Sequence, residues 1–378
     1  MSRTVLSGAF SLRQVESGFL SPLVGYLVDR LGPRKVIFSG VLIAGTGMIL
    51  ISFSTNIGLF YLAFLLASIG IGAASHNVSW AIMVARWFKR KRGRATGLAM
   101  MGGALGGPAV LLISFLQGSL GWRTSVFWLG LGIFVVGIPL SLVARSSPED
   151  YGYQPDGDTV NKSRSDPNGN KVVDENGSGR NHEYTVKEAL RSRPFWGLVV
   201  ILGAQQFAMS GLHVHQIAYF QGIGFTAIEA ASILAIAFSV SAIGRLSVGI
   251  LIDRYDWRGV LASIFVGHII ATLILTNVTT YWHALVFAVT LGLFHGMAVP
   301  SRPFIAGSIF GTKTFGTIWG VVDGAIIIVG LAGPIFLGWT FDTYGTYKPA
   351  FFVIMAVLTI ATPLIYLVFR SGEPNNHA

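Results

Sequence analysis

Long apolar stretches follow one another along most of this chain, and short clusters of charge separate them. Runs of about 20 apolar residues have the length at which an α-helix crosses the hydrocarbon core of a bilayer. We therefore predict an all-α, polytopic bundle of eleven transmembrane helices. Their expected bounds are 4–29, 36–53, 59–85, 95–118, 124–144, 194–220, 227–252, 259–277, 281–309, 314–341 and 347–369.

The segment GYLVDRLGPRKV at residues 25–36 is repeated 224 positions later as GILIDRYDWRGV, with six of twelve positions identical. Each copy closes an apolar run with a cluster of charge, as a transmembrane helix does where it leaves the bilayer. The duplication predicts two pseudo-symmetric halves with a polar site between them. The repeated residues are Gly25 and Gly249, Leu27 and Leu251, Asp29 and Asp253, Arg30 and Arg254, Arg34 and Arg258, and Val36 and Val260.

A polar stretch over residues 145–193 separates the two halves. It is rich in Gly, Asn, Asp and Ser, and too poor in apolar residues to form a core. We expect residues 1–144 to form an N-terminal transmembrane half of five helices and residues 194–370 a C-terminal half of six, followed by a tail at 371–378. The end of the linker, YTVKEALRSRPFW, predicts a short amphipathic helix at the membrane surface.

The register of the repeat also predicts a helix that this sequence does not contain. In the second half, residues 194–220 form a full helix ahead of the helix that ends in the motif. Subtracting 224 places the first-half counterpart at about −30 to −4. We expect truncation rather than an eleven-helix form, because a cavity lined by helices of both halves would otherwise lose one wall.

Composition and charge support a membrane protein. Charged residues make up 12% of the chain, against about 25% in soluble domains. Of the 27 Lys and Arg, 21 fall on one predicted side, so the linker and C-terminus are expected in the cytoplasm and the chain in the cell membrane. The basic residues that give the net charge of +10 lie between apolar spans rather than on one soluble face, which argues against nucleic-acid binding. Cysteine is absent, which excludes disulfides and thiolate chemistry.

Three arginines, Arg13, Arg245 and Arg302, fall inside predicted helices, where a charge is costly enough to suggest a function. Arg245 precedes Asp253 by eight residues, which places it about 12 Å inside the cytoplasmic end. No acid lies within one turn, and a guanidinium binds a carboxylate through two parallel hydrogen bonds. We therefore expect Arg245 to bind a small anionic substrate. A permanent ion pair with Asp323 or Glu16 is the alternative.

The remaining intramembrane charges are weaker candidates. Arg13 could contact the substrate and Glu16 could bind a proton, although the two are three residues apart and could instead pair with each other. Asp323 has no base within one turn, so it needs a partner on another helix, a proton or water. It is the second candidate for proton coupling. Arg302, flanked by prolines, either lines the cavity or holds the irregular backbone that they create.

Histidines and glycines suggest further sites, most of which elementary geometry removes. His213 and His215 point about 200° apart on a helix, so they cannot chelate one metal. The run GGALGG at 102–107 has the spacing of helix packing, and GSIFGTKT at 307–314 departs from the nucleotide-binding loop. We therefore expect no metal, no cofactor and no ATP. An enzyme is least expected, because no nucleophile, base and orienting group stand at a recognisable spacing.

The repeated aspartates require a partner. A helix C-terminus carries about half a negative charge, so Asp29 and Asp253 need cations or another helix's N-terminus nearby. Gly25 and Gly249 fit close helix packing. The alternative for the aspartates is that they merely anchor helix ends. The six basic residues within 86–94 are expected to bind anionic lipid.

The segment GYLVDRLGPRK resembles the signature loop between the second and third helices of the major facilitator superfamily. ARWFKRKRGRATG, GWR at 121–123, PEDYGYQPDG and FDTYGTY resemble its monocarboxylate and oxalate/formate antiporter branch. The resemblance implies a twelve-helix fold, of which this chain has helices two to twelve. It also implies that Asp29 latches the cytoplasmic side against the other half, and that Arg245 binds a substrate carboxylate. It further favours His215 as a substrate or proton contact, with helix packing as the alternative; His76 and Asn77 are undecided in the same way.

The sequence therefore predicts a secondary transporter of a small organic anion, with a monocarboxylate as the expected class and a proton as the candidate coupling ion. A dicarboxylate exchanger is the runner-up. The resemblance weakens it, because the oxalate antiporters place a lysine in the eleventh family helix, where this chain has Val322 and Asp323. A non-transporting membrane sensor and an inactive fragment are two further possibilities.

Overall fold

A computed structural model describes residues 3–74, 76–157, 184–311 and 314–369, and within these ranges its regular elements are helices, without strands. The expected all-α class is confirmed. The first group of elements is α1 (Arg3–Leu31), α2 (Pro33–Ser52), α3 (Ile57–Ala74), the π-helix η1 (His76–Trp80), α4 (Ala81–Trp87), α5 (Arg92–Met100), the 3-10 helix η2 (Met101–Leu105), α6 (Gly106–Leu120), α7 (Trp122–Val143), η3 (Glu149–Tyr151) and η4 (Pro155–Gly157).

The remaining part of the described chain begins at residue 184. It comprises α8 (Val186–Arg191), α9 (Arg193–Gly222), α10 (Ala227–Arg254), α11 (Trp257–Thr276), α12 (Tyr281–Phe310), α13 (Phe315–Tyr344) and α14 (Lys348–Val368).

Within the described ranges, nine helical stretches are long and apolar enough to cross a membrane. One of them runs from Ile57 to Trp87 through α3, η1 and α4. The predicted spans 4–29 and 95–118 are not among the nine. The first corresponds to α1, and the second is divided into α5, η2 and α6. The count of eleven transmembrane helices therefore stays a prediction.

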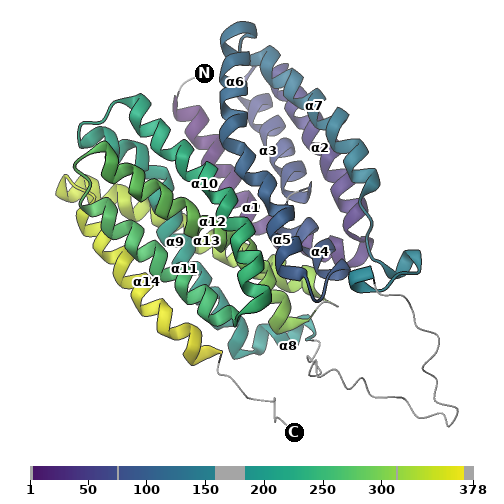
Figure 1. Ribbon diagram of the computed structural model, residues 1–378. Helices are drawn as coiled ribbons and strands as arrows, with labels where there is room; N and C mark the ends of the chain where they lie inside the picture. The colour runs from purple at the N-terminus through teal and green to yellow at the C-terminus, as the bar shows by residue number, and fades with distance from the viewer. Residues whose placement is uncertain (1–2, 75, 158–183, 312–313, 370–378) are drawn as a thin grey trace, which may run out of the picture.

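The helices gather into two groups that follow the chain, α1–α7 and α9–α14 (Figure 1). Two pairs of helices join the groups, because α1 packs along α13 and α10 packs along α5. Both junctions depend on glycine. A Cβ added to Gly25 of α1 would lie 2.0 Å from the carbonyl oxygen of Gly316 in α13, and a Cβ on Gly97 of α5 would lie 2.3 Å from that of Arg245 in α10. Such close backbone approach stabilises helix pairs in lipid through van der Waals contact.

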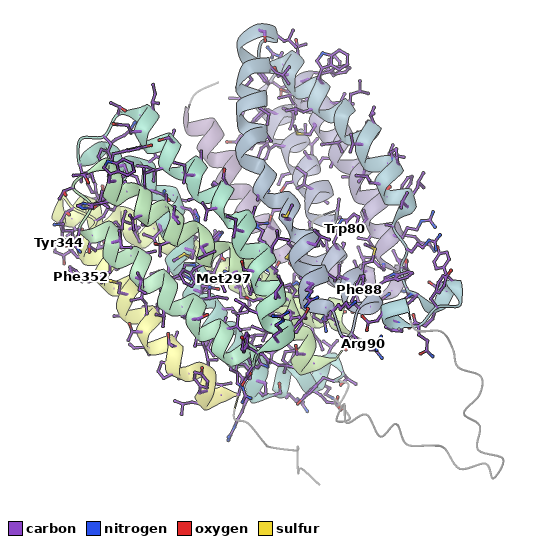
Figure 2. All side chains as sticks on the ribbon, viewed as in Figure 1. Trp80, Phe88, Arg90, Met297, Tyr344 and Phe352 are labelled. Carbon is purple, nitrogen blue, oxygen red and sulfur yellow. The ribbon has the colours of Figure 1, made fainter. Side chains whose placement is uncertain are left out.

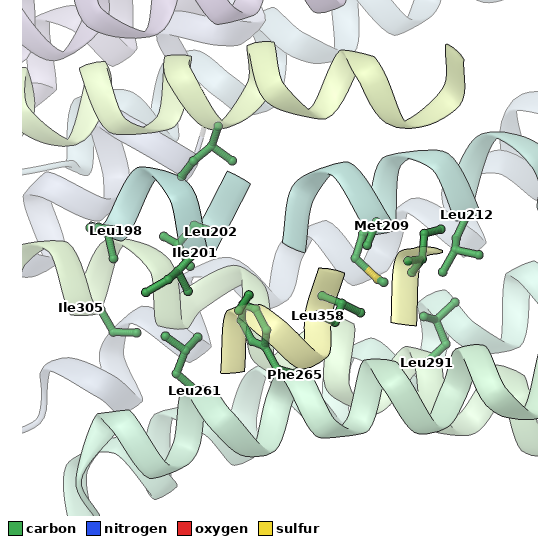
Figure 3. Packing of buried hydrophobic residues seen from close by; sticks show 14 of the residues in the cluster. Leu198, Ile201, Leu202, Met209, Leu212, Leu261, Phe265, Leu291, Ile305 and Leu358 are labelled. Atoms are coloured by element: carbon green, nitrogen blue, oxygen red, sulfur yellow. The ribbon is translucent and has the colours of Figure 1, made fainter. Parts of the chain in front are cut away.

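The apolar core lies mainly in the second group. Figure 3 shows buried side chains of α9, α11, α12 and α14 packed together, among them Leu202, Phe265, Leu291 and Leu358, each almost fully buried. In the first group, α2 meets α3 through small residues, since a Cβ on Gly70 would lie 2.1 Å from the nitrogen of Ala44. Shape complementarity, rather than exclusion of water, holds such helices together in a bilayer.

The predicted short helix before the second half is confirmed as α8. Its first turn is closed by a capping box, in which the Thr185 N–H donates to Glu188 Oε2 (2.7 Å) and the Glu188 N–H donates to Thr185 Oγ1 (3.3 Å). Ser192 then caps α9 by accepting from the Phe195 N–H (3.3 Å). Tyr184 is tied to the junction of α12 and α13, because its carbonyl accepts from Thr314 Oγ1 (2.7 Å). The location of α8 at the membrane surface stays a prediction.

Candidate functional site

The carboxylate of Asp29, at the C-terminal end of α1, lies at the N-terminus of α13. The Gly316 N–H donates to Oδ1 (3.0 Å), and the Thr317 N–H (2.7 Å) and hydroxyl (2.8 Å) both donate to Oδ2. Arg86 forms an ion pair with the same carboxylate (3.7 Å). A helix N-terminus carries unpaired N–H groups and partial positive charge. The negative charge of Asp29, which is unfavourable at the C-terminus of α1, is therefore compensated by the N-terminus of α13 in the other group.

Asp253 makes the same contact from the opposite direction. At the end of α10, its Oδ1 accepts from the Gly93 N–H (2.8 Å) and its Oδ2 from the Arg94 N–H (3.2 Å), at the start of α5. The Arg94 side chain adds an ion pair (3.7 Å). The two aspartates therefore form a pseudo-symmetric pair of contacts, each joining one group of helices to the other.

The receiving helices carry a second internal repeat, which the sequence reasoning missed. Gly93 and Gly97 in α5 correspond to Gly316 and Gly320 in α13, in almost the same register as the repeated motif. A Cβ on Gly93 would lie 2.5 Å from Asp253 Oδ1, and a Cβ on Gly316 would lie 2.6 Å from Asp29 Oδ1. The shared signal is G-x-x-x-G, which is too common in transmembrane helices to identify a repeat.

Of the remaining motif residues, the glycines lie at the junctions between the groups and the arginines lie nearer the surface. Gly25 and Gly249 are confirmed as close-packing positions, since a Cβ on Gly249 would lie 2.6 Å from the Gly93 carbonyl oxygen. Arg30 is exposed and donates to the Tyr26 hydroxyl (3.1 Å). Arg254 is also exposed, and Arg34 is half-buried.

The basic segment at 86–94, for which lipid binding stays a prediction, also contacts the other group of helices. Besides the ion pairs of Arg86 and Arg94, the buried Arg92 guanidinium lies over the rings of Phe304 (5.8 Å) and Phe315 (5.3 Å) of the other group. Arg90, labelled in Figure 2, marks this end of the molecule, and Tyr344 lies at the opposite end. The cationic segment therefore participates in the junction between the two groups.

Arg245 lies deeper along the same junction and is buried, with 5% of its surface exposed. One guanidinium nitrogen, Nη1, donates to the carbonyl oxygen of Met100, while Nε has no hydrogen-bond partner among the described residues. In the same part of the chain, no ion pair joins Arg245 to Asp323 or to Glu16. The ion-pair alternative is therefore not supported, and the guanidinium retains an unused donor.

The packing expected for the glycine run at 102–107 is wrong at Gly102 and Gly106 and is met at Gly103. Packing of another helix was expected on it, but a Cβ on Gly102 or on Gly106 would meet nothing within 4 Å. A Cβ on Gly103 would instead lie 2.4 Å from Arg245 Nη1. The α-helix changes to the 3-10 helix η2 at this level. Glycine suits position 103 because the missing side chain leaves room for the Arg245 guanidinium.

Asp323 has the partner on another helix that its isolation required. Its Oδ2 accepts from the hydroxyl of Ser21 in α1 (2.8 Å), and the residue is 8% exposed. Arg302 in α12 acts on it electrostatically. The carboxylate is therefore held at the interface between the two groups. In the register that aligns Gly316 with Gly93, its position corresponds to that of Met100.

Arg302 is held by two amides of α9. Its Nε (3.2 Å) and Nη2 (3.1 Å) donate to Gln205 Oε1, and Nη1 donates to Gln206 Oε1 (2.8 Å). Sequence reasoning missed both glutamines, because nothing in the chain links positions that lie so far apart along it. Arg302 thus joins α12 to α9, and its positive charge interacts with the Asp323 carboxylate.

Three remaining candidates lie apart from Arg245. Glu16 accepts from Ser68 Oγ, and its Oε1 is buried without a partner in the described structure. Arg13 is exposed and acts on Glu16 electrostatically. His215 donates from Nε2 to the Pro334 carbonyl (2.9 Å) and accepts at Nδ1 from the Tyr347 hydroxyl (3.1 Å), which favours the packing alternative. The side chains of His76 and Asn77 lie outside the described part of the structure.

Comparison with known proteins supports this architecture. The model of the Major Facilitator Superfamily matches residues 1–276. Monocarboxylate transporter 12 of Mus musculus is 25% identical over 365 residues, covering 92% of this chain and 74% of that protein. Monocarboxylate transporter 13 of Bos taurus is 27% identical over 350 residues, covering 90% and 74%. A crystal structure of the major facilitator transporter FucP in the outward conformation has a TM-score of 0.70 at 16% identity, covering 98% of this chain and 91% of that chain.

Proposed function

This chain belongs to the Major Facilitator Superfamily, and on this premise we propose that it carries a small organic anion, a monocarboxylate, across the cell membrane by alternating access. The superfamily assignment makes it a multi-pass membrane transporter and not an enzyme, related to monocarboxylate transporters. The proposed orientation places the linker and the C-terminus in the cytoplasm, on the side of the basic segments.

The observation that carries the anionic substrate is the environment of Arg245. The guanidinium is buried at the junction between the two groups, and it donates to a neutral backbone carbonyl. A charge in this position needs an opposite charge, and its planar fork matches a carboxylate. A bound carboxylate supplies both the charge and further acceptors for the guanidinium. Arg302, held by Gln205 and Gln206, adds positive charge to the same interior.

Alternating access requires junctions that can break and re-form, and the two aspartate contacts have this character. Each consists of hydrogen bonds between a carboxylate and the first N–H groups of a facing helix. A charge at a helix terminus contributes about 1–2 kcal/mol in a partly buried geometry. Two such contacts can therefore bias the equilibrium between two transporter states without locking it. We assign the gating role to Asp29 and Asp253 on this ground.

Proton coupling is the finer part of the proposal, with Asp323 and Glu16 as acidic candidates. Of these two acids, Asp323 is the one that lies at the junction between the groups, hydrogen-bonded to Ser21 and acted on by the charge of Arg302.

The test of the function uses the purified full chain in proteoliposomes. Uptake of radiolabelled acetate, L-lactate and pyruvate is measured against liposomes without protein. Two solutes without net charge, a hexose and a zwitterionic amino acid, serve as controls. We expect saturable uptake of at least one carboxylate and none of the hexose. Carboxylate uptake equal to that of empty liposomes, with uptake of the hexose instead, would contradict an anionic substrate.

A further inference from the structure

Three histidines outside the proposed substrate contacts meet inside the second group of helices. They are His213 of α9, His268 of α11 and His295 of α12, and we call them the histidine cluster. The ring centroids of His213 and His295 are 4.6 Å apart, and those of His268 and His295 are 6.4 Å apart. Met297, two residues beyond His295 on α12, marks their level, well away from both ends of the helices (Figure 2).

The hydrogen bonds fix where two of the rings carry their protons. His213 Nδ1 lies 2.8 Å from the Met209 carbonyl oxygen, which only accepts, so Nδ1 is the donor. The carboxamide oxygen of Gln205 already accepts from Arg302. Its NH₂ group therefore faces His268 Nδ1 (3.5 Å), which must be the acceptor. His268 consequently carries its proton on Nε2.

Two nitrogens of the cluster remain without partners. His268 Nε2 and His295 Nδ1 are both buried, and neither has a hydrogen-bond partner among the described residues. A small cavity lies beside His213 and His295, and the rest of its lining is apolar or glycine: Leu234, Ala237, Phe238, Leu291 and Gly292. An unpaired polar atom in such surroundings is costly and is seldom retained for packing alone. His268 thus presents an unpaired N–H in the interior, and His295 presents an unpaired ring nitrogen.

The charges around the cluster are positive. Arg302 of α12 acts electrostatically on His268 and His295, and Arg245 of α10 acts on His295. The facing acid is Asp323 of α13, which acts on Arg302 and is hydrogen-bonded to Ser21 of α1. Two guanidinium groups oppose a further positive charge on the imidazoles, so the cluster stays neutral until negative charge arrives nearby.

We propose that the histidine cluster binds the co-transported proton, and that an anion bound at Arg245 makes this binding possible. The inference rests on the proposed function. A carboxylate at Arg245 cancels positive charge that acts on His295 and so lowers the electrostatic cost of an imidazolium. The basic ring nitrogen of His295 takes up the proton, and the imidazolium lies against the rings of His213 and His268. When the anion leaves, the two arginines again disfavour the imidazolium and the proton is released on the same side.

Proton and anion therefore travel together, because each lowers the electrostatic cost of binding the other. By linkage, the proton increases anion affinity by the same factor as the anion increases proton affinity. Arg245 acts on His295 directly through its charge. The second arginine, Arg302, is connected to the cluster through Gln205, by hydrogen bonds of 3.1 Å to Arg302 and 3.5 Å to His268.

The test separates exchange from proton-driven accumulation, using the full chain in proteoliposomes and the carboxylate that the parent carries among acetate, L-lactate and pyruvate. Counterflow of the labelled carboxylate measures binding and alternation without net proton movement. Accumulation under an imposed pH gradient, and acidification of the lumen seen by a trapped pH dye as the carboxylate enters, measure coupling. We expect His295→Gln and His268→Gln to retain counterflow at saturating carboxylate, with a weaker apparent affinity as linkage requires, while gradient-driven accumulation falls at least tenfold.

His283→Gln is the matched control, because His283 is exposed at the start of α12 and contacts Thr279 (3.1 Å). It should retain both activities. Should the cluster variants fail to fold, proton uptake by the detergent-solubilised parent on adding the carboxylate tests the same step without mutation. Counterflow by the parent without any proton uptake overturns this proposal and leaves the transport function standing. Full gradient-driven accumulation by His295→Gln also overturns it. Absence of counterflow in the parent contradicts the proposed function itself.

Discussion

Arg245 occupies in the second copy of the repeat the position that Ser21 holds in the first, and each side chain reaches into the opposite group of helices. Ser21 donates to Asp323 of α13, whereas Arg245 donates to the Met100 carbonyl at the end of α5. Met100 and Asp323 are themselves equivalent positions of the two receiving helices. The fold therefore supplies two equivalent contacts, and the sequence places a cation in one and an anion in the other. The proposed polar site is therefore asymmetric in charge, although the two contacts that form it occupy equivalent positions.

The first prediction concerns the contact between Asp29 and α13. Asp29→Asn keeps the size of the side chain but removes the charge that three donors and Arg86 stabilise. We expect the population to shift away from the state in which this junction is closed by about 1–3 kcal/mol, a typical coupling energy. The chain has no cysteine, so single cysteines introduced beside the N-terminus of α13 report accessibility directly. Asp342→Asn, at an exposed site near the far end of α13, is the control. Equal labelling of the parent and Asp29→Asn would leave Asp29 as a simple anchor.

The second prediction tests the close approach of α1 and α13. Gly25→Ala adds a Cβ that would lie 2.0 Å from the Gly316 carbonyl oxygen, so the two helices must separate. We expect a loss of about 1–3 kcal/mol in stability, as for comparable overpacked sites. Thermal unfolding in detergent measures it. Gly132→Ala in α7 is the matched control, because its Cβ would meet nothing within 4 Å. Equal melting temperatures for the parent and the Gly25 variant would show that the helices do not pack as described.

The third prediction uses two adjacent glycines of η2. Gly103→Ala would place a Cβ 2.4 Å from Arg245 Nη1, while Gly102→Ala would meet nothing within 4 Å. We expect the first variant to displace the guanidinium and reduce carboxylate uptake at least tenfold, and the second to transport like the parent. The pair controls for helix propensity, because both replace glycine by alanine in the same segment. Equal uptake by the two variants would show that Arg245 does not need the space beside Gly103.

The sequence predicted the helices well because long apolar runs and the charges that end them are local signals. It predicted the first repeat because the motif concentrates charge at a helix end, where few residue types are tolerated. The receiving helices share glycines, Gly93 with Gly316 and Gly97 with Gly320, since their N-terminal N–H groups, rather than distinctive side chains, bind the aspartates. Backbone donors leave almost no trace in a sequence.

The polar site was predicted only in part. Arg245 and Asp323 could be found because intramembrane charge is rare, but their partners could not. Ser21 contributes a hydroxyl and Met100 only a backbone carbonyl. Their role depends on which helices cross, and the periodicity of the sequence does not reveal that. Gln205 likewise became significant only when α9 and α12 placed it between Arg302 and His268.

The measurement that tests the central claim most directly is carboxylate uptake by Arg245 variants in proteoliposomes, after folding and insertion have been checked by size-exclusion profile and thermal melting. Arg245→Lys keeps the positive charge but loses the planar fork, so we expect it to fold and lose most uptake. We expect Arg245→Ala to lose all of it. Normal uptake by Arg245→Ala, across the carboxylates that the parent carries, would remove Arg245 from the substrate site and contradict an anionic substrate bound at this junction.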